Sequence, residues 1–166
     1  MSRNKFGVVI LPESEVVKFV ENHFRYSNNV LVSRHNVGAK KIDNRFIRFG
    51  TAGEPDFIGI IAAVHCPSCG AVVAEGVYLA IECKKADGTL RENQRLWLRK
   101  YQDYGAITCV ARPVPSEFDP TGFKALREQL ESLELAICRD CEILPDRQEL
   151  AERYPPFNLH KRKAAL

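Results

Sequence analysis

The sequence predicts a mixed α/β fold in which a β-sheet is flanked by helices. Segments with helical apolar spacing alternate with short apolar runs typical of strands, in the order helix, three or more strands, helix, strand, helix. The chain has 166 residues, enough for one domain with a core of its own. Its 45% hydrophobic and 27% charged residues exclude a disordered chain.

The N-terminal part is expected to form a helix and two strands. Apolar residues recur at helical spacing over residues 15–24, and Ser14 is placed to cap the start of this helix. Residues 30–33 and 45–49 are expected to be strands because β-branched and aromatic residues are frequent there. A loop that contains Gly38 and two lysines is expected to join them.

Two apolar strands form the expected centre of the sheet. The run 57–64 is apolar enough to be buried on both faces, and 77–84 is a second central strand. The segment 66–70 between them is typical of a tight turn, and a helix over 91–104 and a strand over 106–111 follow. The inner face of that helix is expected to carry Gln94, Trp97, Leu98 and Tyr101.

A further helix is expected after Asp119, a favourable N-cap residue that is followed by a proline. Its apolar stripe consists of Phe123, Leu126, Leu130, Leu133 and Ile137. Because the stripe covers only two heptads, we expect it to dock on the core rather than to form a coiled coil. The tail over 154–166 is basic and is expected to be flexible.

Charge is unevenly distributed along the chain. The net charge is +3, but residues 1–116 carry 16 Lys and Arg against 11 Asp and Glu, whereas residues 117–152 carry 4 against 10. This pattern permits nucleic acid as a partner, although an unevenly charged, solvated surface is the simpler explanation on composition alone.

The apolar runs are short. None approaches the roughly 20 residues of a membrane-spanning helix, and the stretch 6–11 is too short for a secretory signal. We therefore expect no membrane association and a cytoplasmic location, where disulfides are rare and six cysteines need another explanation.

Three charged residues are placed to carry chemistry. Asp56 precedes the first central strand, while Glu82 and Lys84 lie two apart at the end of the second, so their side chains share a face. If the two strands pair as a hairpin, Asp56 and Glu82 converge on one cation, and their hard oxygen ligands suit Mg²⁺ or Mn²⁺. A lysine beside such a metal can hold the attacking water and stabilise charge on a phosphate, which indicates metal-assisted phosphodiester hydrolysis.

The same residues have an ordinary explanation. An E-x-K triplet occurs often as a solvated pair on an edge strand, and Pro-Asp is a common turn dipeptide. Here the triplet ends an apolar central strand, where charged groups are costly unless they are paired or bound to a metal. This context favours a functional site.

Several motifs occur in a fixed order along the chain. They are SEVV at 14–17, RHNVG at 34–38, RFIRFG at 45–50, GEPDFIG at 53–59, YLAIECKK at 78–85, GTLRENQ at 88–94, Trp97-Leu98 and Gly105-Ala106. Together they resemble the VRR-NUC branch of the PD-(D/E)XK nucleases, in particular its small stand-alone, phage-type members. The resemblance covers roughly residues 13–112, and its motifs agree in both order and spacing.

The resemblance implies a restriction-endonuclease-like fold and Mg²⁺-dependent cleavage of DNA. It implies that Asp56 and Glu82 bind the metal and that the backbone carbonyl of Cys83 completes the site. Lys84 is then the catalytic lysine. The Cys83 side chain itself is expected to point away from this face and into the core, rather than to act as a nucleophile.

Two further side chains receive roles from the resemblance. Gln94 would reach the site from the helix that follows, although a solvated or helix-packing amide would have the same sequence. Glu15 matches the helix-borne acid that acts on the metal directly or through water. Glu13 and Glu21 are close neighbours, and the helix dipole favours a glutamate in the first turn in any case.

Two C-x-x-C pairs form a second constellation. Cys66 and Cys69 lie in the turn between the central strands, and Cys138 and Cys141 lie where the acidic C-terminal helix is expected to end. Such pairs suggest one structural zinc site of four thiolates that fastens this helix to the hairpin. Two unrelated thiol pairs, or His65 joining the first pair, are the alternatives.

The resemblance as a whole predicts a Mg²⁺-dependent DNA endonuclease, with branched or junction DNA as candidate substrates and RNA as an open alternative. It also predicts a homodimer, located in the host cytoplasm if a phage encodes the chain. The competing hypothesis is a non-catalytic, zinc-stapled DNA-binding or interaction module on a nuclease scaffold. We expect a nuclease core over 1–116 with a zinc-knuckle hairpin at 65–76, a helical extension packed on the core over 117–153, and the tail over 154–166.

Overall fold

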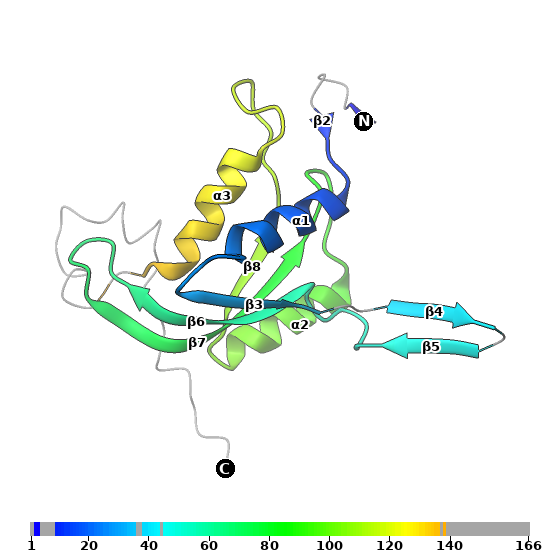
Figure 1. Cartoon of the computed structure of the whole chain (residues 1–166), viewed down its shortest axis with the longest axis horizontal. Coiled ribbons are helices and arrows are strands. Elements are labelled where there is room, and N and C mark those ends of the chain that lie inside the picture. Colours follow the sequence, from blue (N-terminus) through cyan, green and yellow to red (C-terminus); the bar gives the residue numbers. More distant parts are fainter. Residues whose placement is uncertain (1, 4–8, 36–37, 44, 137, 139–166) are drawn as a thin grey trace, which may run out of the picture.

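The computed structural model describes residues 2–3, 9–35, 38–43, 45–136 and 138, and these residues form a mixed α/β fold (Figure 1). The main sheet contains, in spatial order, β3 (Val30–Arg34), β6 (Phe57–His65), β7 (Val72–Cys83) and β8 (Ile107–Ala111). β7 pairs antiparallel with β6 and parallel with β8. The sheet is therefore mixed, as predicted, and β7 is a central strand.

Helices cover both faces of this sheet. α1 (Glu13–Phe24) and α3 (Phe123–Glu131) lie on one face, and α2 (Glu92–Asp103) lies on the other (Figure 1). The main core lies between the sheet and the helices α1 and α3. Its fully buried members include Val16, Val20, Leu79, Ile81, Leu126 and Leu130. Among the described residues, no helix combines the length and the apolar character needed to span a bilayer.

Smaller elements surround this body. β1 (Ser2–Arg3) pairs with β2 (Val9–Ile10), and a short 3-10 helix, η1 (Ser132–Glu134), follows α3. β4 (Gly38–Ile42) and β5 (Arg45–Phe49) form a two-stranded ribbon that projects from the sheet (Figure 1). The sequence predicted a loop around Gly38, and this prediction was wrong because β5 supplies backbone partners for the whole segment from Gly38 to Ile42.

The prediction that residues 57–64 are buried on both faces is also wrong. Ile60 is 48% exposed, and its cross-strand neighbours Leu31 and Tyr78 are 74% and 37% exposed. All three lie on the face that carries α2, which contacts β7 and β8. A continuous apolar run predicts burial only where a helix covers the strand, and here one helix covers part of the face.

α1 begins earlier than the sequence suggested. Its first residue is Glu13, and Pro12, in an extended conformation, takes the cap position that was assigned to Ser14. The Glu15 backbone N–H donates to the Pro12 carbonyl at 2.9 Å, so the helical turn already includes Glu13. The first residue of the helix is therefore itself an acid.

α3 begins later than predicted. Gly122, with a φ of 73°, precedes the first helical residue, Phe123. Asp119 still supports this end, because its carboxylate accepts hydrogen bonds from the Thr121 hydroxyl and from the Lys124 backbone N–H, both at 2.7 Å. These bonds hold the pKa of Asp119 below its usual value.

Candidate functional site

The β6–β7 hairpin places Asp56 beside the end of β7. Phe57 pairs with Ile81, so Asp56, directly before β6, lies next to the last residues of β7. Its Oδ2 accepts the backbone N–H of Cys83 at 2.8 Å. The hairpin that the sequence predicted is present, and a hydrogen bond fixes the Asp56 carboxylate at its open end.

Glu82 and Lys84 form a buried ion pair at this end of the sheet. Glu82 is 1% exposed and Lys84 is 6% exposed. Lys84 Nζ donates to Glu82 Oε1 at 2.5 Å and to the Cys83 carbonyl at 2.9 Å. Within the described part of the chain, the other oxygen of Glu82, Oε2, is buried and has no hydrogen-bond partner. The lysine thus contacts two of the oxygens that the resemblance assigns to a metal, while a third oxygen lacks a partner.

Gln94 joins this pair from α2. Its Nε2 donates to Glu82 Oε1, and its own Oε1 accepts the backbone N–H of Arg91 at 3.0 Å. The second bond belongs to the cap at the start of α2, so the amide orientation is fixed by the helix. Gln94 therefore connects the helix end to Glu82 rather than pointing into solvent.

The structure brings Glu13, and not Glu15, to the site. Glu13 Oε2 lies 3.5 Å from Lys84 Nζ. Glu15 instead pairs with Lys18 at 2.9 Å on the exposed side of α1. The resemblance to the nuclease family favoured Glu15, but the helix begins at Glu13, directly after a proline, and Glu13 reaches the end of β7.

The charges at the site are not balanced. Burial is the main cause that raises the pKa of Glu82, to about 7, and the Asp56 charge adds to it while Lys84 opposes it. Burial likewise raises the pKa of Asp56. For Lys84, burial alone would lower the pKa, but the hydrogen bond and charge of Glu82 outweigh it. The charges of Lys84 and Arg34 lower the pKa of Asp56, yet the pKa values of Asp56 and Glu82 both remain raised, so the site favours an additional positive charge.

A turn before β6 supports Asp56. The His35 backbone N–H donates to the Asp56 carbonyl at 2.7 Å, and the His35 ring lies 3.6 Å from a carboxylate oxygen of Glu54. In the same turn Gly53 has a φ of 97°, and a Cβ there would lie 2.8 Å from the Asn93 backbone. A glycine is thus needed where this turn passes against the start of α2. Nothing in the sequence distinguishes His35 and Glu54 from the other residues of their motifs.

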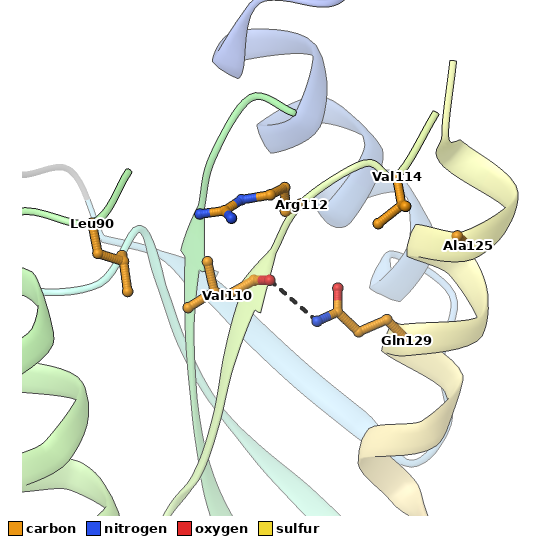
Figure 2. Close-up of a pocket in the computed structure, with 6 residues that line it drawn as sticks. All are labelled: Leu90, Val110, Arg112, Val114, Ala125 and Gln129. Atoms are coloured by element: carbon orange, nitrogen blue, oxygen red, sulfur yellow. Dashed lines mark hydrogen bonds between the residues drawn. The ribbon is translucent and has the colours of Figure 1, made fainter. Parts of the chain in front are cut away.

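A cleft of about 440 Å³ adjoins this site (Figure 2). Its lining residues come from β8, α3 and the segments next to them, and they are Leu90, Val110, Arg112, Val114, Ala125 and Gln129. In Figure 2 the Arg112 guanidinium extends away from α3, toward the side on which Leu90 lies. Its Nε is buried and has no hydrogen-bond partner among the described residues. The carbonyl of Ala111, the residue before Arg112, accepts the Lys84 backbone N–H at 2.9 Å, so the backbone that carries Arg112 runs beside that of Lys84.

Sequence reasoning missed Arg112. A single arginine after a strand forms no pattern with its neighbours, and only the pairing of β7 with β8 places it beside Lys84. Nothing in the sequence distinguishes Arg112 from the exposed basic residues of the chain. Its unpartnered Nε becomes visible only in the structure.

Three of the four predicted cysteine ligands lie together at the opposite end of the hairpin. The sulfur atoms of Cys66, Cys69 and Cys138 all lie within 4.8 Å of one another, and this cluster could hold a metal ion such as zinc. Cys141 lies outside the described residues. Within the described chain, no other group of three or more Cys, His, Asp or Glu side chains has its donor atoms this close together.

The cysteines differ in their surroundings. Burial alone would raise the pKa of Cys66, but backbone N–H groups directed at its sulfur lower it to about 6. Cys83 and Cys109 are buried in the core, as expected for both, and burial raises the pKa of each thiol, to about 12 for Cys109. Their low exposure and raised pKa values mark these two as structural thiols.

No family model, curated protein or solved structure matches the chain. The resemblance to the VRR-NUC nucleases therefore rests on the order and spacing of the motifs.

Proposed function

We propose that the protein is a metal-dependent DNA endonuclease that hydrolyses phosphodiester bonds. The observation that carries this proposal is the buried Glu82–Lys84 pair at the end of the central strand: Gln94 donates to Glu82, and Asp56 accepts the N–H of Cys83, the residue between the two. Buried charges are costly, and an excess of carboxylates around one lysine makes them more so. Such an arrangement is typical of sites where charge is needed for chemistry.

The residues fit a hard divalent cation such as Mg²⁺ or Mn²⁺. Asp56, Glu82 and the Cys83 carbonyl would hold it, with Glu13 as a further acid from α1. All of these donors are oxygens, and the buried, unpartnered Oε2 of Glu82 is the kind of atom that a cation satisfies. When bound, Mg²⁺ supplies a Lewis acid and makes a coordinated water more acidic.

The chain's own groups then have distinct tasks. Lys84 holds the attacking water or a phosphate oxygen through its ammonium group, which Glu82 keeps protonated. Gln94 fixes the orientation of Glu82, and the Cys83 N–H fixes that of Asp56. These are positioning contacts made before substrate arrives, so little reorganisation is required in the transition state.

Two basic segments adjoin the site and support DNA as the substrate. Residues 34–50 carry five Lys and Arg against one Asp, and residues 84–100 carry six against two Asp and Glu. The first includes the projecting β4–β5 ribbon, and the second includes α2. Arg112, whose guanidinium lines the neighbouring cleft, adds a further cation at this end of β8. Cations so placed can bind the phosphates on either side of a cleaved bond.

One observation favours a second candidate, a non-catalytic DNA-binding module. Lys84 already contacts both Glu82 Oε1 and the Cys83 carbonyl, so the site has an internal cation. A scaffold that had lost catalysis could retain this pair for stability alone. The two candidates differ in whether a divalent cation enters the site.

The decisive experiment is a plasmid-nicking assay with and without Mg²⁺ or Mn²⁺. We expect the wild-type protein to nick DNA only with metal, and Asp56→Ala and Glu82→Ala to abolish nicking. Glu75→Gln is a matched control, because Glu75 is exposed on the same strand as Glu82 and far from the site. Circular dichroism establishes that each variant is folded.

Near-wild-type nicking by either alanine variant contradicts the assignment. Metal-independent DNA binding without any cleavage supports the non-catalytic candidate instead. Single-stranded, duplex, flap and four-way-junction DNA, together with matched RNA, then identify the preferred substrate.

We also propose that the protein acts as a homodimer. The described part of one chain has one such carboxylate site, whereas symmetric cleavage of two strands needs two, and a two-fold dimer is the commonest assembly. We expect sedimentation to show a dimer in free solution or on DNA. Only monomers under both conditions contradict this proposal.

A further inference from the structure

The turn of the β6–β7 hairpin meets the chain that follows α3. Cys66 and Cys69 lie in this turn, and Cys138 reaches it from beyond η1. We propose that these three thiolates bind one structural zinc ion, which fastens the turn to the chain after η1. Cys141, the fourth ligand that the sequence predicts, lies outside the described residues, so the proposal rests on the three sulfurs that the structure brings together.

The spacing of the sulfurs suits a tetrahedral metal. With Zn–S bonds of about 2.3 Å, two sulfurs on one zinc lie about 3.8 Å apart. Cys69 Sγ and Cys138 Sγ are 3.6 Å apart, and all three sulfurs lie within 4.8 Å of one another. A disulfide would need a distance of roughly 2.05 Å. The cluster therefore has the dimensions of a metal site.

Cys66 is the buried member of the cluster, with 1% of the residue exposed, whereas Cys138 is partly buried and Cys69 is exposed. Cys138 comes from a different segment of the chain than Cys66 and Cys69. One ion held by the three sulfurs therefore joins the two segments.

The turn itself has the shape needed to present two ligands. The Gly70 backbone N–H donates to the Cys66 carbonyl at 2.8 Å, and the Cys66 N–H donates to the Ala71 carbonyl at 2.8 Å. Gly70 has a φ of 76°, which a glycine adopts without strain. His65 Nδ1 lies 3.5 Å from the Gly70 carbonyl. The ring is thus engaged with the turn rather than with the sulfurs.

The zinc acts on a short part of the chain. Ala136 N–H donates to the His65 carbonyl at 3.0 Å, and the Asn29 side chain donates to Glu134 at 2.5 Å. Leu126 and Leu130 are fully buried. α3 is therefore attached to the core by its own contacts as well. The metal adds a link between residues 66–70 and the chain at Cys138, beyond the end of this helix.

The first experiment measures zinc in protein purified without chelator. We expect one zinc per chain, and cobalt(II) exchanged into the wild-type protein should give the intense visible bands of tetrahedral thiolate ligation. Absence of zinc together with absence of these bands overturns the proposal. So does a Cys69–Cys138 disulfide found by mass spectrometry in the protein as purified under reducing conditions, before any metal is removed.

Variants locate the ion. Cys69→Ser and Cys138→Ser should lose the bound zinc, whereas Cys109→Ala, which removes a buried thiol outside the cluster, should keep it. Limited proteolysis of Cys138→Ser should cut within 66–70 or near residue 138 and spare α3. Retention of one zinc by both serine variants contradicts the proposal.

The readout does not depend on nuclease activity. Zinc content and the cobalt spectrum are measured without DNA, and Glu82→Ala should retain the full zinc content. Failure of the endonuclease proposal would leave these results unchanged. If the zinc proposal fails, the endonuclease proposal is still tested by the nicking activity of the Asp56 and Glu82 variants.

Discussion

The two ends of the β6–β7 hairpin carry opposite kinds of chemistry. At the open end, carboxylates and a carbonyl surround the ammonium group of Lys84, whereas at the turn three sulfurs lie within 4.8 Å of one another. β6 has 9 residues, so at about 3.3 Å per residue the two sites are separated by roughly 30 Å. Hard oxygen donors suit Mg²⁺ and thiolates suit zinc, so our two proposals assign a different ion to each end of the hairpin.

The ends also differ in how their charges are stabilised. At the open end, the Lys84 side chain supplies the positive charge that the carboxylates of Glu82 and Glu13 contact. At the turn, backbone N–H groups lower the pKa of the Cys66 thiol to about 6, and three sulfurs lie within 4.8 Å of one another. The ammonium group of a lysine side chain can move during a reaction, whereas backbone N–H groups are held in place by the fold. This contrast is what a catalytic site and a structural site would show.

The largest effect that tests this comparison is expected for Lys84→Ala. Without metal, the variant leaves Glu82 buried and unpaired, and breaking such a pair costs about 3 kcal/mol. The freed oxygens of Glu82 and Cys83 become available to Mg²⁺, so added Mg²⁺ should raise the unfolding midpoint of the variant more than that of the wild type. We also expect nicking to fall by a factor of about 10² or more.

Lys85→Ala is the matched control for this variant. Lys85 is the next residue, half exposed, and pairs with Asp87 at 3.1 Å on the surface. Its loss should change stability by less than about 1 kcal/mol, with or without Mg²⁺. If Mg²⁺ stabilises neither Lys84→Ala nor the wild type, the open end holds a structural ion pair and the comparison with the turn fails.

The elements that the sequence predicted well are those whose signals are local. Strand periodicity and the apolar run before Glu82 predicted the hairpin, and the hairpin by itself places Asp56 next to the end of β7. The inner face of α2 followed from its spacing, and Gln94 lies on it. Short-range spacing in the two C-x-x-C motifs similarly indicated a shared cluster, of which the structure describes three members.

The features that sequence reasoning missed depend on the assembled fold. Arg112 is significant only because β8 lies parallel to β7. The bond between Asn29 and Glu134 joins residues that are 105 positions apart, and no local pattern announces it. The exposure of Ile60 depends on how far one helix covers a face. Each of these is a property of packing between elements, which a single sequence does not encode in its spacing.

The smallest expected effect compares two acids in the first turn of α1. Glu13 lies 3.5 Å from Lys84, whereas Glu15 pairs with Lys18 on the surface. Both interact with the helix dipole, so Glu13→Gln and Glu15→Gln should each lower stability by a similar amount, about 0.3–1 kcal/mol. Only the first removes a charge from the open end of the hairpin, and we expect it to slow nicking about tenfold, which is 1.4 kcal/mol in the barrier.

The paired design separates stability from chemistry. Thermal unfolding should give nearly equal midpoints for the two variants, while nicking rates should differ, with Glu15→Gln close to wild type. A larger loss in Glu15→Gln would restore the assignment that the family motif favours, and would mean that the start of α1 turns toward the site differently when DNA binds. Nicking at the wild-type rate by both variants would place both acids outside the chemistry. Asp56 and Glu82 would then be the carboxylates on which cleavage depends.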